Sequence, residues 1–274
     1  MKNLKTHKSF EGLTQFWSHH SVVTKTEMKF STFIPAGEVK GCVIWLSGLT
    51  CTDENFITKA GAQAYLAKAG LMVICPDTSP RGLNLPGEHD AYDFGSGAGF
   101  YVDATTEGYR GHYKMFSYIN EEIYSLIQKE FKQTQISIMG HSMGGHGALV
   151  IGLKNASKYA AISTFSPIVN PMQCDWGKKA FRGYLGENES SWRAYDACEL
   201  LAQGLKHPQQ ILIHQGTQDE FLEKQLLTGH LEAGAKKAEQ AVSVKYCEGY
   251  DHSYYFISTY IQEHIDHHAR AIQK

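Results

Sequence analysis

The sequence predicts an α/β fold in which helices cover both faces of a mostly parallel central sheet. Short apolar runs alternate along the chain with longer stretches of helical periodicity, an order typical of parallel sheets. Residues 41–46 and 71–75 are apolar throughout, as expected for strands that are buried on both faces. Such sheets carry their chemistry in the loops at the carboxyl ends of the strands, so we expect a functional site there.

The individual elements follow from periodicity and from the residues that end each run. Residues 28–34 alternate polar and apolar side chains, Gly70 ends a helical stretch, and Pro76 ends the strand that comes after it. Residues 77–111 are rich in glycine, have no clear period and are expected to form a long loop. We expect strands at 28–34, 41–46, 71–75, 135–139, 160–165, 211–213 and 242–247, and helices at 56–69, 113–131, 144–154, 221–238 and 253–272.

Composition and charge exclude several classes of protein. The chain has 274 residues, of which 42% are hydrophobic and 20% charged, and it contains no linker or internal repeat, so we expect one domain over residues 1–274. A formal net charge of −2 leaves no basic surface for nucleic acid and no polybasic segment for a membrane. The longest apolar runs fall far short of the roughly 20 residues that span a bilayer.

The cysteines indicate a reducing compartment. None of the six cysteines forms a Cys-x-x-Cys pair, and a chain of this size can build a core without disulfides. We therefore expect reduced thiols and a cytoplasmic location.

A candidate nucleophile follows the predicted strand at 135–139. The sequence Gly140-His141-Ser142-Met143-Gly144 matches Gly-x-Ser-x-Gly between a strand and a helix, the arrangement that raises a serine hydroxyl above a sheet on a sharp turn. Glycine is needed in so tight a turn because a side chain would collide with neighbouring backbone. A chance match would lack this strand-turn-helix context, so we interpret Ser142 as a nucleophile.

A serine nucleophile requires a base and a carboxylate that orients the base. In this type of fold the acid follows a later strand and the histidine lies near the end of the chain. Asp219 follows the strand at 211–213, and His252 follows the last strand. Glu220 is an alternative to Asp219, which could also cap the next helix, whereas Asp251 is expected to bond loop backbone.

The remaining histidines have other interpretations. His141 and His146 flank Ser142 on the turn and helix, and we expect them to pack around the site. His264 and His268 share one face of the terminal helix, where a solvated face is favoured over a metal site because no third ligand has suitable spacing.

Backbone amides are expected to bind the oxyanion. The amide of Met143 begins the helix after Ser142, and a second amide should come from the loop after the strand at 41–46. Leu49, just past Gly48, is the natural candidate, although a neighbour on either side would satisfy the same pattern.

Beyond the triad pattern, six blocks in the same order resemble the S-formylglutathione hydrolase (esterase D) family over nearly the whole chain. The blocks are 45–52 (WLSGLTCT), 76–82 (PDTSPRG), 93–104 (DFGSGAGFYVDA), 140–149 (GHSMGGHGAL), 176–181 (WGKKAF) and 249–256 (GYDHSYYF). The resemblance implies an α/β-hydrolase fold and cleavage of S-formylglutathione to glutathione and formate, with side activity on short acyl esters. It further implies a cytoplasmic homodimer or larger homo-oligomer that needs no cofactor.

Three residues are candidates for substrate contacts. Cys51 lies two residues beyond the expected oxyanion amide, so its thiol could border the pocket. Trp176, with Lys178 and Lys179 nearby, could receive a leaving group that carries two carboxylates, or could belong to an amphipathic helix with solvated lysines.

Two rival functions remain open at this point. A general short-chain carboxylesterase or an acyltransferase would use the same three catalytic residues. A non-catalytic binding protein on this fold would have no need of an intact Ser142, Asp219 and His252.

Overall fold

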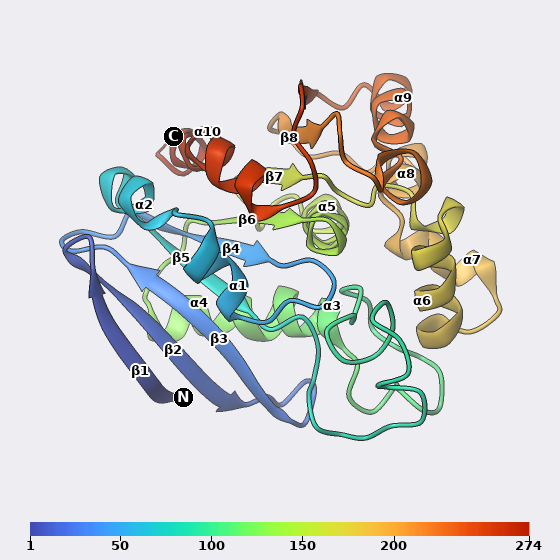
Figure 1. The fold of residues 1–274 in the computed structure, drawn as a ribbon, viewed down its shortest axis with the longest axis horizontal. Helices are drawn as coiled ribbons and strands as arrows, with labels where there is room; N and C mark the ends of the chain where they lie inside the picture. The colour runs from blue at the N-terminus through green and yellow to red at the C-terminus, as the bar shows by residue number, and fades with distance from the viewer. Residues whose placement is uncertain (274) are drawn as a thin grey trace.

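The computed structural model describes residues 1–273 and contains one nine-stranded sheet (Figure 1). The strand order is β1-β2-β3-β5-β4-β6-β7-β8-β9. From β5 onward all neighbours are parallel, whereas β1, β2 and β3 join the edge of this sheet as antiparallel strands. The strands are β1 (Lys2–Ser9), β2 (Gly12–His20), β3 (Glu27–Ile34), β4 (Gly41–Leu46), β5 (Leu71–Pro76), β6 (Ile136–His141), β7 (Ile162–Phe165), β8 (Ile211–Gly216) and β9 (Val242–Cys247).

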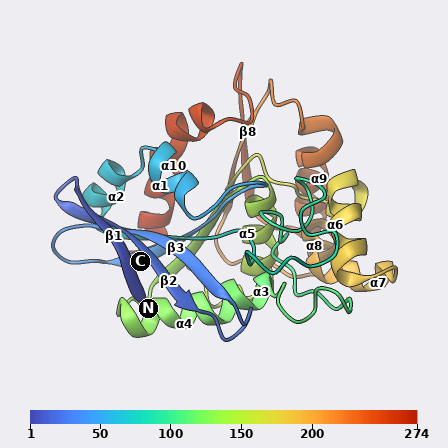
Figure 2. The ribbon, with the colours of Figure 1, turned by 60° about the horizontal axis from the view of Figure 1, so that its bottom comes forward.

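The helices lie on both sides of the sheet, as predicted. On one side are α1, α2 and α10, and on the other are α4 and α5, while α6 to α9 cover the far end of the molecule (Figures 1 and 2). The α-helices are α1 (Glu54–Lys59), α2 (Gln63–Ala69), α3 (Met115–Ser117), α4 (Tyr124–Glu130), α5 (Met143–Lys154), α6 (Asp175–Leu185), α7 (Glu189–Trp192), α8 (Ala197–Ala202), α9 (Thr228–Ala238) and α10 (Tyr254–Ile272).

The alternation of side chains along β4 divides the interior into two cores. Ile44 packs in the core on the α5 side, whereas Val43 and Trp45 pack on the side of α1, α2 and α10. Because both faces of β4 are covered, all six of its residues are buried, which explains its continuous apolar sequence. Strands β4 and β6 run in register from Cys42↔Ile136 to Leu46↔Gly140, so the loops that follow them leave the sheet side by side.

Several boundaries differ from the sequence-based expectation. The predicted helix at 56–69 is divided into α1 and α2, between which Gly61 has a φ of +63°. The predicted helix at 113–131 contains a π-helical turn, Tyr118–Ile123, between α3 and α4. Likewise, the predicted helix at 221–238 begins with a π-helical turn, Leu222–Leu226, before α9. Strands β1 and β2 and helices α7 and α8 were not predicted as elements. Helix α6, with Lys178 and Lys179 exposed, corresponds to the amphipathic helix that was one of the two interpretations of the segment around Trp176.

The expectation of a solvated histidine face on the terminal helix was wrong. His264 and His268 are both fully buried, on the side of α10 that packs on β6, β7 and β8. Within residues 1–273, no group of histidine, cysteine or acidic side chains could hold a metal ion, and no helix is long and apolar enough to cross a membrane.

Candidate active site

The turn after β6 holds Ser142 in a conformation that side chains rarely adopt. Its φ of 57° and ψ of −119° lie in a region that favours glycine. A Cβ at position 140 would collide with the carbonyl of Gly144, and one at Gly144 would collide with the carbonyl of Leu46. Gly140 is therefore required for the tightness of the turn itself, and Gly144 for its close approach to β4.

Backbone hydrogen bonds fix the conformation of Ser142. Its amide donates to the carbonyl of Phe165 at 3.0 Å, and its own carbonyl accepts from the amides of His146 at 3.0 Å and Ile168 at 3.2 Å. These partners belong to α5 and to the end of β7 and the segment after it, so three parts of the fold hold this residue in place. The side chain is thus presented from rigid backbone rather than from a flexible loop.

Asp219 and His252 meet at the carboxyl end of the sheet, although they are 33 residues apart. His252 Nδ1 lies 2.6 Å from Asp219 Oδ2. The carboxylate is fully buried, and it also accepts hydrogen bonds from the side chain of Gln215 at 3.3 Å and the amide of Phe221 at 3.0 Å. Because a carboxylate can only accept, Nδ1 carries the proton and Nε2 is left as the basic nitrogen.

The two other acidic residues near Asp219 and His252 in the sequence, Glu220 and Asp251, do not hydrogen-bond His252. Glu220 is exposed, and Asp251 accepts hydrogen bonds from the amide of Ser253 at 3.0 Å and from its hydroxyl at 2.6 Å. Asp251 therefore bonds its own loop, as predicted.

His141 packs against His252 with ring centroids 4.4 Å apart. Burial lowers the pKa of His141 well below its usual value, and the proximity of His252 lowers it further. The His141 ring is therefore uncharged at neutral pH and does not repel a positive charge on His252. His146 points away from this pair, with its Nε2 2.9 Å from the carbonyl of Phe100.

The loop after β4 lies against Ser142. A Cβ at Gly48 would stand only 3.1 Å from the Cβ of Ser142, so this loop and the serine turn are in close contact. Leu49 follows directly on the same loop, and Met143 is the first residue of α5. The two predicted oxyanion amides thus belong to segments that flank the serine.

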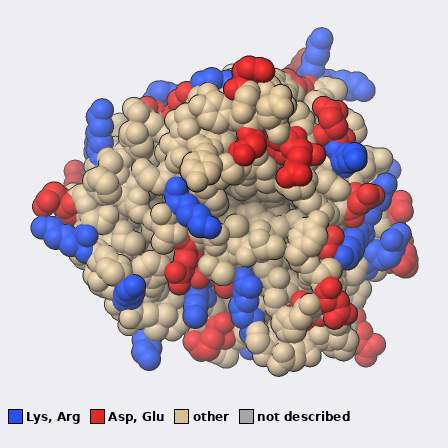
Figure 3. Space-filling model, in the orientation of Figure 1, with Lys and Arg blue, Asp and Glu red and all other residues tan. Residues whose placement is uncertain are grey.

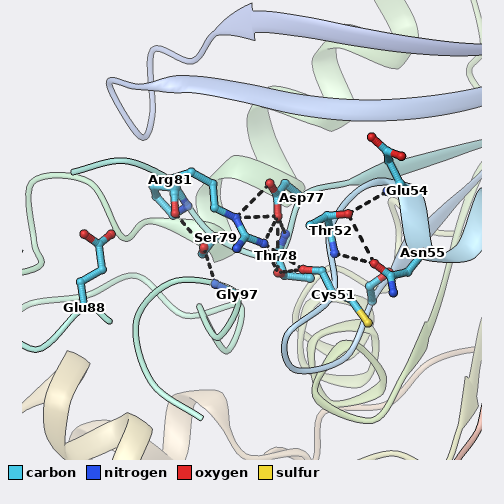
Figure 4. A network of polar contacts seen from close by, with 12 residues as sticks. Cys51, Thr52, Glu54, Asn55, Asp77, Thr78, Ser79, Arg81, Glu88 and Gly97 are labelled. Atoms are coloured by element: carbon cyan, nitrogen blue, oxygen red, sulfur yellow. Dashed lines mark hydrogen bonds and ion pairs between the residues drawn. The ribbon is translucent and has the colours of Figure 1, made fainter. Parts of the chain in front are cut away.

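A polar network behind the loop fixes its path (Figure 4). The carbonyl of Cys51 accepts hydrogen bonds from Thr78 Oγ1 at 2.6 Å and Arg81 Nη2 at 2.9 Å. The guanidinium in turn pairs with the buried carboxylate of Asp77 at 2.7 Å. One residue earlier, Thr50 has a φ of +65° and donates its amide to the carbonyl of Gly97 at 2.9 Å. The glycine-rich region at 77–111 therefore supports the loop that approaches Ser142.

A cavity of about 340 Å³ opens over the serine. It is lined by Gly48, Leu49, Thr50, Cys51, Asn55, Lys59, Tyr92, His141, Ser142, Trp176, Phe221, His252, Ser253 and Tyr254. Its size and mixed lining fit a small organic substrate. Figure 3 shows this hollow near the centre of the face, with charged side chains at its edges.

The predicted substrate contacts are divided between two hollows. Cys51 and Trp176 line the cavity over Ser142. Lys178 instead lines a separate hollow of about 470 Å³ with Lys179, which pairs with Asp93. The structure therefore does not place Lys178 among the residues around Ser142.

Three aromatic residues form one wall of the cavity. Trp176 Nε1 donates to the hydroxyl of Tyr92 at 3.1 Å, and the Trp176 and Phe221 rings are 4.8 Å apart. Phe221 also packs edge-on against His252, with centroids 5.0 Å apart. Sequence reasoning missed Tyr92 and Phe221, although Phe221 lies only two residues from Asp219.

Sequence reasoning also missed Lys59 and Asn55. Both lie on α1 four residues apart, a spacing that places them on the same side of a helix. Their position directly after the loop 47–53 is the signal that could have identified them.

Comparisons with known proteins match nearly the whole chain. The Esterase family model matches residues 21–267. S-formylglutathione hydrolase of Mus musculus is 49% identical over 276 residues, covering 98% of each chain, and that of Arabidopsis thaliana is 46% identical over 97% of this chain and 96% of its own.

A solved structure of S-formylglutathione hydrolase from Agrobacterium tumefaciens is 42% identical and superposes with a TM-score of 0.96 over 99% of this chain and 100% of its own. A ferulic acid esterase that is 15% identical superposes with a TM-score of 0.69 over 96% of this chain and 100% of its own, and so shares the fold. With an α/β-hydrolase fold and near-complete coverage at this identity, the chain belongs to the S-formylglutathione hydrolase family of esterases.

Proposed function

We propose that this protein hydrolyses S-formylglutathione to glutathione and formate, with Ser142 as nucleophile, His252 as base and Asp219 as the orienting acid. The observation that carries the proposal is the 2.6 Å contact between His252 and Asp219 at the edge of the cavity that Ser142 lines. The names of the relatives supply the substrate, and membership of an esterase family supports side activity on short acyl esters.

The first half of the reaction transfers the formyl group to the protein. Ser142 Oγ attacks the formyl carbon as His252 Nε2 takes its proton, and Asp219 stabilises the imidazolium that forms. The carbon–sulfur bond then breaks, and the departing glutathione sulfur receives that proton. A thiol leaves readily because its ordinary pKa is about 8.5, far below that of an alcohol.

The second half of the reaction releases formate. His252 takes a proton from a water molecule, whose oxygen attacks the formyl ester, and the proton returns to Ser142 Oγ as the ester bond breaks. In both halves negative charge develops on the carbonyl oxygen, and the amides of Leu49 and Met143 donate hydrogen bonds to it. The close contact between Gly48 and Ser142 supports this role for the loop.

Location and assembly form a further part of the proposal. The chain acts in the cytoplasm as a homodimer or larger homo-oligomer, which the six family-like sequence blocks support. Size-exclusion chromatography with light scattering tests the assembly, and a monomer at micromolar concentration would contradict it.

The test is steady-state hydrolysis of S-formylglutathione and of 4-nitrophenyl acetate by the wild type and Ser142→Ala. We expect the wild type to prefer the thioester by orders of magnitude, and the variant to lose about 10⁵-fold in kcat on both substrates. Preference for the acetate would retain the serine mechanism and reject the substrate. A variant that kept both activities would reject the mechanism.

A further inference from the structure

Lys59 lies where two hollows of the surface meet. It is in the last turn of α1, and it lines both the cavity over Ser142 and an adjoining hollow of about 590 Å³. The two hollows share Lys59, Ser253 and Tyr254, and the second extends between them to Tyr255 and Ser258 on α10. A ligand longer than the acyl group can therefore leave the serine across Tyr254 and pass Lys59.

Lys59 supplies an unpaired positive charge to this path. Among residues 1–273, no other lysine or arginine and no acidic side chain lines either hollow. The Lys59 ammonium lies 5.8 Å from the centre of the Tyr254 ring, and none of the ion pairs of the described residues includes Lys59. By contrast, Lys179 and Arg182, which line the separate hollow with Lys178, are paired with Asp93 and Glu187.

The charges of the leaving group match this arrangement. The glutamyl end of glutathione carries an ammonium beside a carboxylate and is neutral as a whole, whereas the glycyl end carries one carboxylate alone. A single unpaired cation is therefore complementary to the glycyl end. Figure 3 shows a basic side chain at one edge of the central hollow.

We propose that Lys59 binds the glycyl carboxylate of S-formylglutathione, and that the peptide lies across Tyr254 in the hollow between α1 and α10. The proposal rests on the function proposed above and names the contact that selects a glutathione thioester over a neutral ester. The Lys59 ammonium lies over the Tyr254 ring, and this cation–π contact orients the lysine side chain.

The experiment measures kcat and KM for S-formylglutathione and 4-nitrophenyl acetate with Lys59→Gln, Lys59→Arg and Lys68→Gln. Lys68 is the matched control because it occupies the last turn of α2, is exposed and lines neither hollow. In Lys59→Gln we expect KM for the thioester to rise about tenfold and the ratio of thioester to acetate kcat/KM to fall by the same factor. Lys59→Arg should restore most of this loss, and Lys68→Gln should match the wild type.

A substrate variant identifies the carboxylate. S-formylglutathione with its glycyl carboxylate converted to an ethyl ester should lose about tenfold in kcat/KM with the wild type and almost nothing further with Lys59→Gln, because both changes remove the same contact. Additive losses, an unchanged Lys59→Gln, or an equal loss in Lys178→Gln would overturn the proposal. If the wild type itself fails to cleave S-formylglutathione, the proposed function fails instead.

Discussion

Two serines of this protein are each surrounded by histidines, yet only one has the surroundings of a nucleophile. Ser142 lies in a strained turn beside His141 and His252, at the floor of an open cavity. Ser163, in β7, accepts or donates hydrogen bonds with His264 Nδ1 at 2.8 Å and His268 Nε2 at 2.7 Å. Both sites thus contain a serine hydroxyl and two imidazoles within one short region.

The two clusters differ in whether a substrate can reach the serine and in whether a buried carboxylate orients the histidine. Ser163, His264 and His268 are fully buried, and His264 stacks on Phe165 with centroids 3.8 Å apart. Its other nitrogen bonds His214, whose outer nitrogen is 3.4 Å from the half-exposed carboxylate of Glu263. No substrate can reach this cluster, so its hydrogen bonds join α10 to β7 and β8. Residue type alone therefore does not define a nucleophile.

The largest expected difference between the two clusters comes from replacing Asp219 in the cluster around Ser142 and Ser163 in the buried cluster. Asp219→Asn would hold His252 in the wrong tautomer, and we expect kcat to fall about 10³- to 10⁴-fold with little change in KM. Ser163→Ala should retain kcat within about twofold, because its cluster touches no substrate. Steady-state kinetics on S-formylglutathione measures both, and a large kcat loss in Ser163→Ala would remove the distinction.

The buried cluster should instead affect stability. His264→Ala removes a stacked ring and two hydrogen bonds from the interior, so we expect the free energy of unfolding to fall by about 2–4 kcal/mol. Urea denaturation followed by circular dichroism measures this change, and His20→Ala, at an exposed position on β2, serves as the control. A loss below about 0.5 kcal/mol would show that the network contributes little.

The same cluster predicts how stability depends on pH. Burial lowers the pKa of His214 to about 4 and holds the pKa values of His264 and His268 well below their usual range. At His214 the nearby carboxylate of Glu263 opposes this shift of the pKa, whereas the charge of Lys245 adds to it. In the unfolded chain these histidines bind protons below about pH 6.5, so the unfolded state binds more protons than the folded state. Their contribution is therefore complete above pH 6.5 and is lost as pH falls toward 4.

The measurement is the free energy of unfolding between pH 7.5 and pH 4.5 for the wild type and His264→Gln/His268→Gln. We expect the wild type to be more sensitive to acid by up to about 1.4 kcal/mol per pH unit for each histidine removed. Both proteins contain the same carboxylates, so the contribution of these groups cancels in the difference between the two curves. One of them is Asp53, and burial raises its pKa to about 7. Parallel curves would mean that these histidines have the same pKa in the folded and the unfolded chain.

The smallest expected effect is the inhibition of activity by modification of the Cys51 thiol, which lies beside the cluster around Ser142. Cys51 lines the cavity over Ser142, whereas Cys42 and Cys75 are fully buried. Burial raises the pKa of Cys51, so we expect a bulky maleimide to inhibit the wild type slowly at pH 7 and faster at pH 9. Cys51→Ala should resist inhibition, and unchanged inhibition of this variant would show that the thiol does not border the site.

Local sequence pointed to the cluster around Ser142 because Ser142, Asp219 and His252 each lie in the segment that follows a strand. Apolar runs defined β6, β8 and β9, and the residues after them gave Ser142, Asp219 and His252. The buried cluster could not be predicted in this way, because the partners of His264 and His268 are 50 to 105 residues distant in sequence. Ile261 and Ile265 do share their helical stripe, which was a signal for burial.

The substrate contacts were predicted only in part for a geometric reason. Trp176 and Lys178 are two residues apart on α6, and such neighbours point to different sides of a helix. Lys59 is at the end of α1, 13 residues beyond β4, so its place at the cavity depends on the path of the loop and helix between them. The ribbon of β1 and β2 was missed because nearly every residue of β1 is exposed, which removes the apolar alternation that marks a strand.

The positive φ of Ser142 has a consequence for how this protein can change over evolutionary time. Glycine would relax the same turn, so replacement of the serine would make the fold more stable while abolishing its chemistry. Selection for thermal stability alone would therefore favour loss of the proposed nucleophile. The serine at position 142 therefore costs folding stability, and the catalytic role proposed for it offsets that cost.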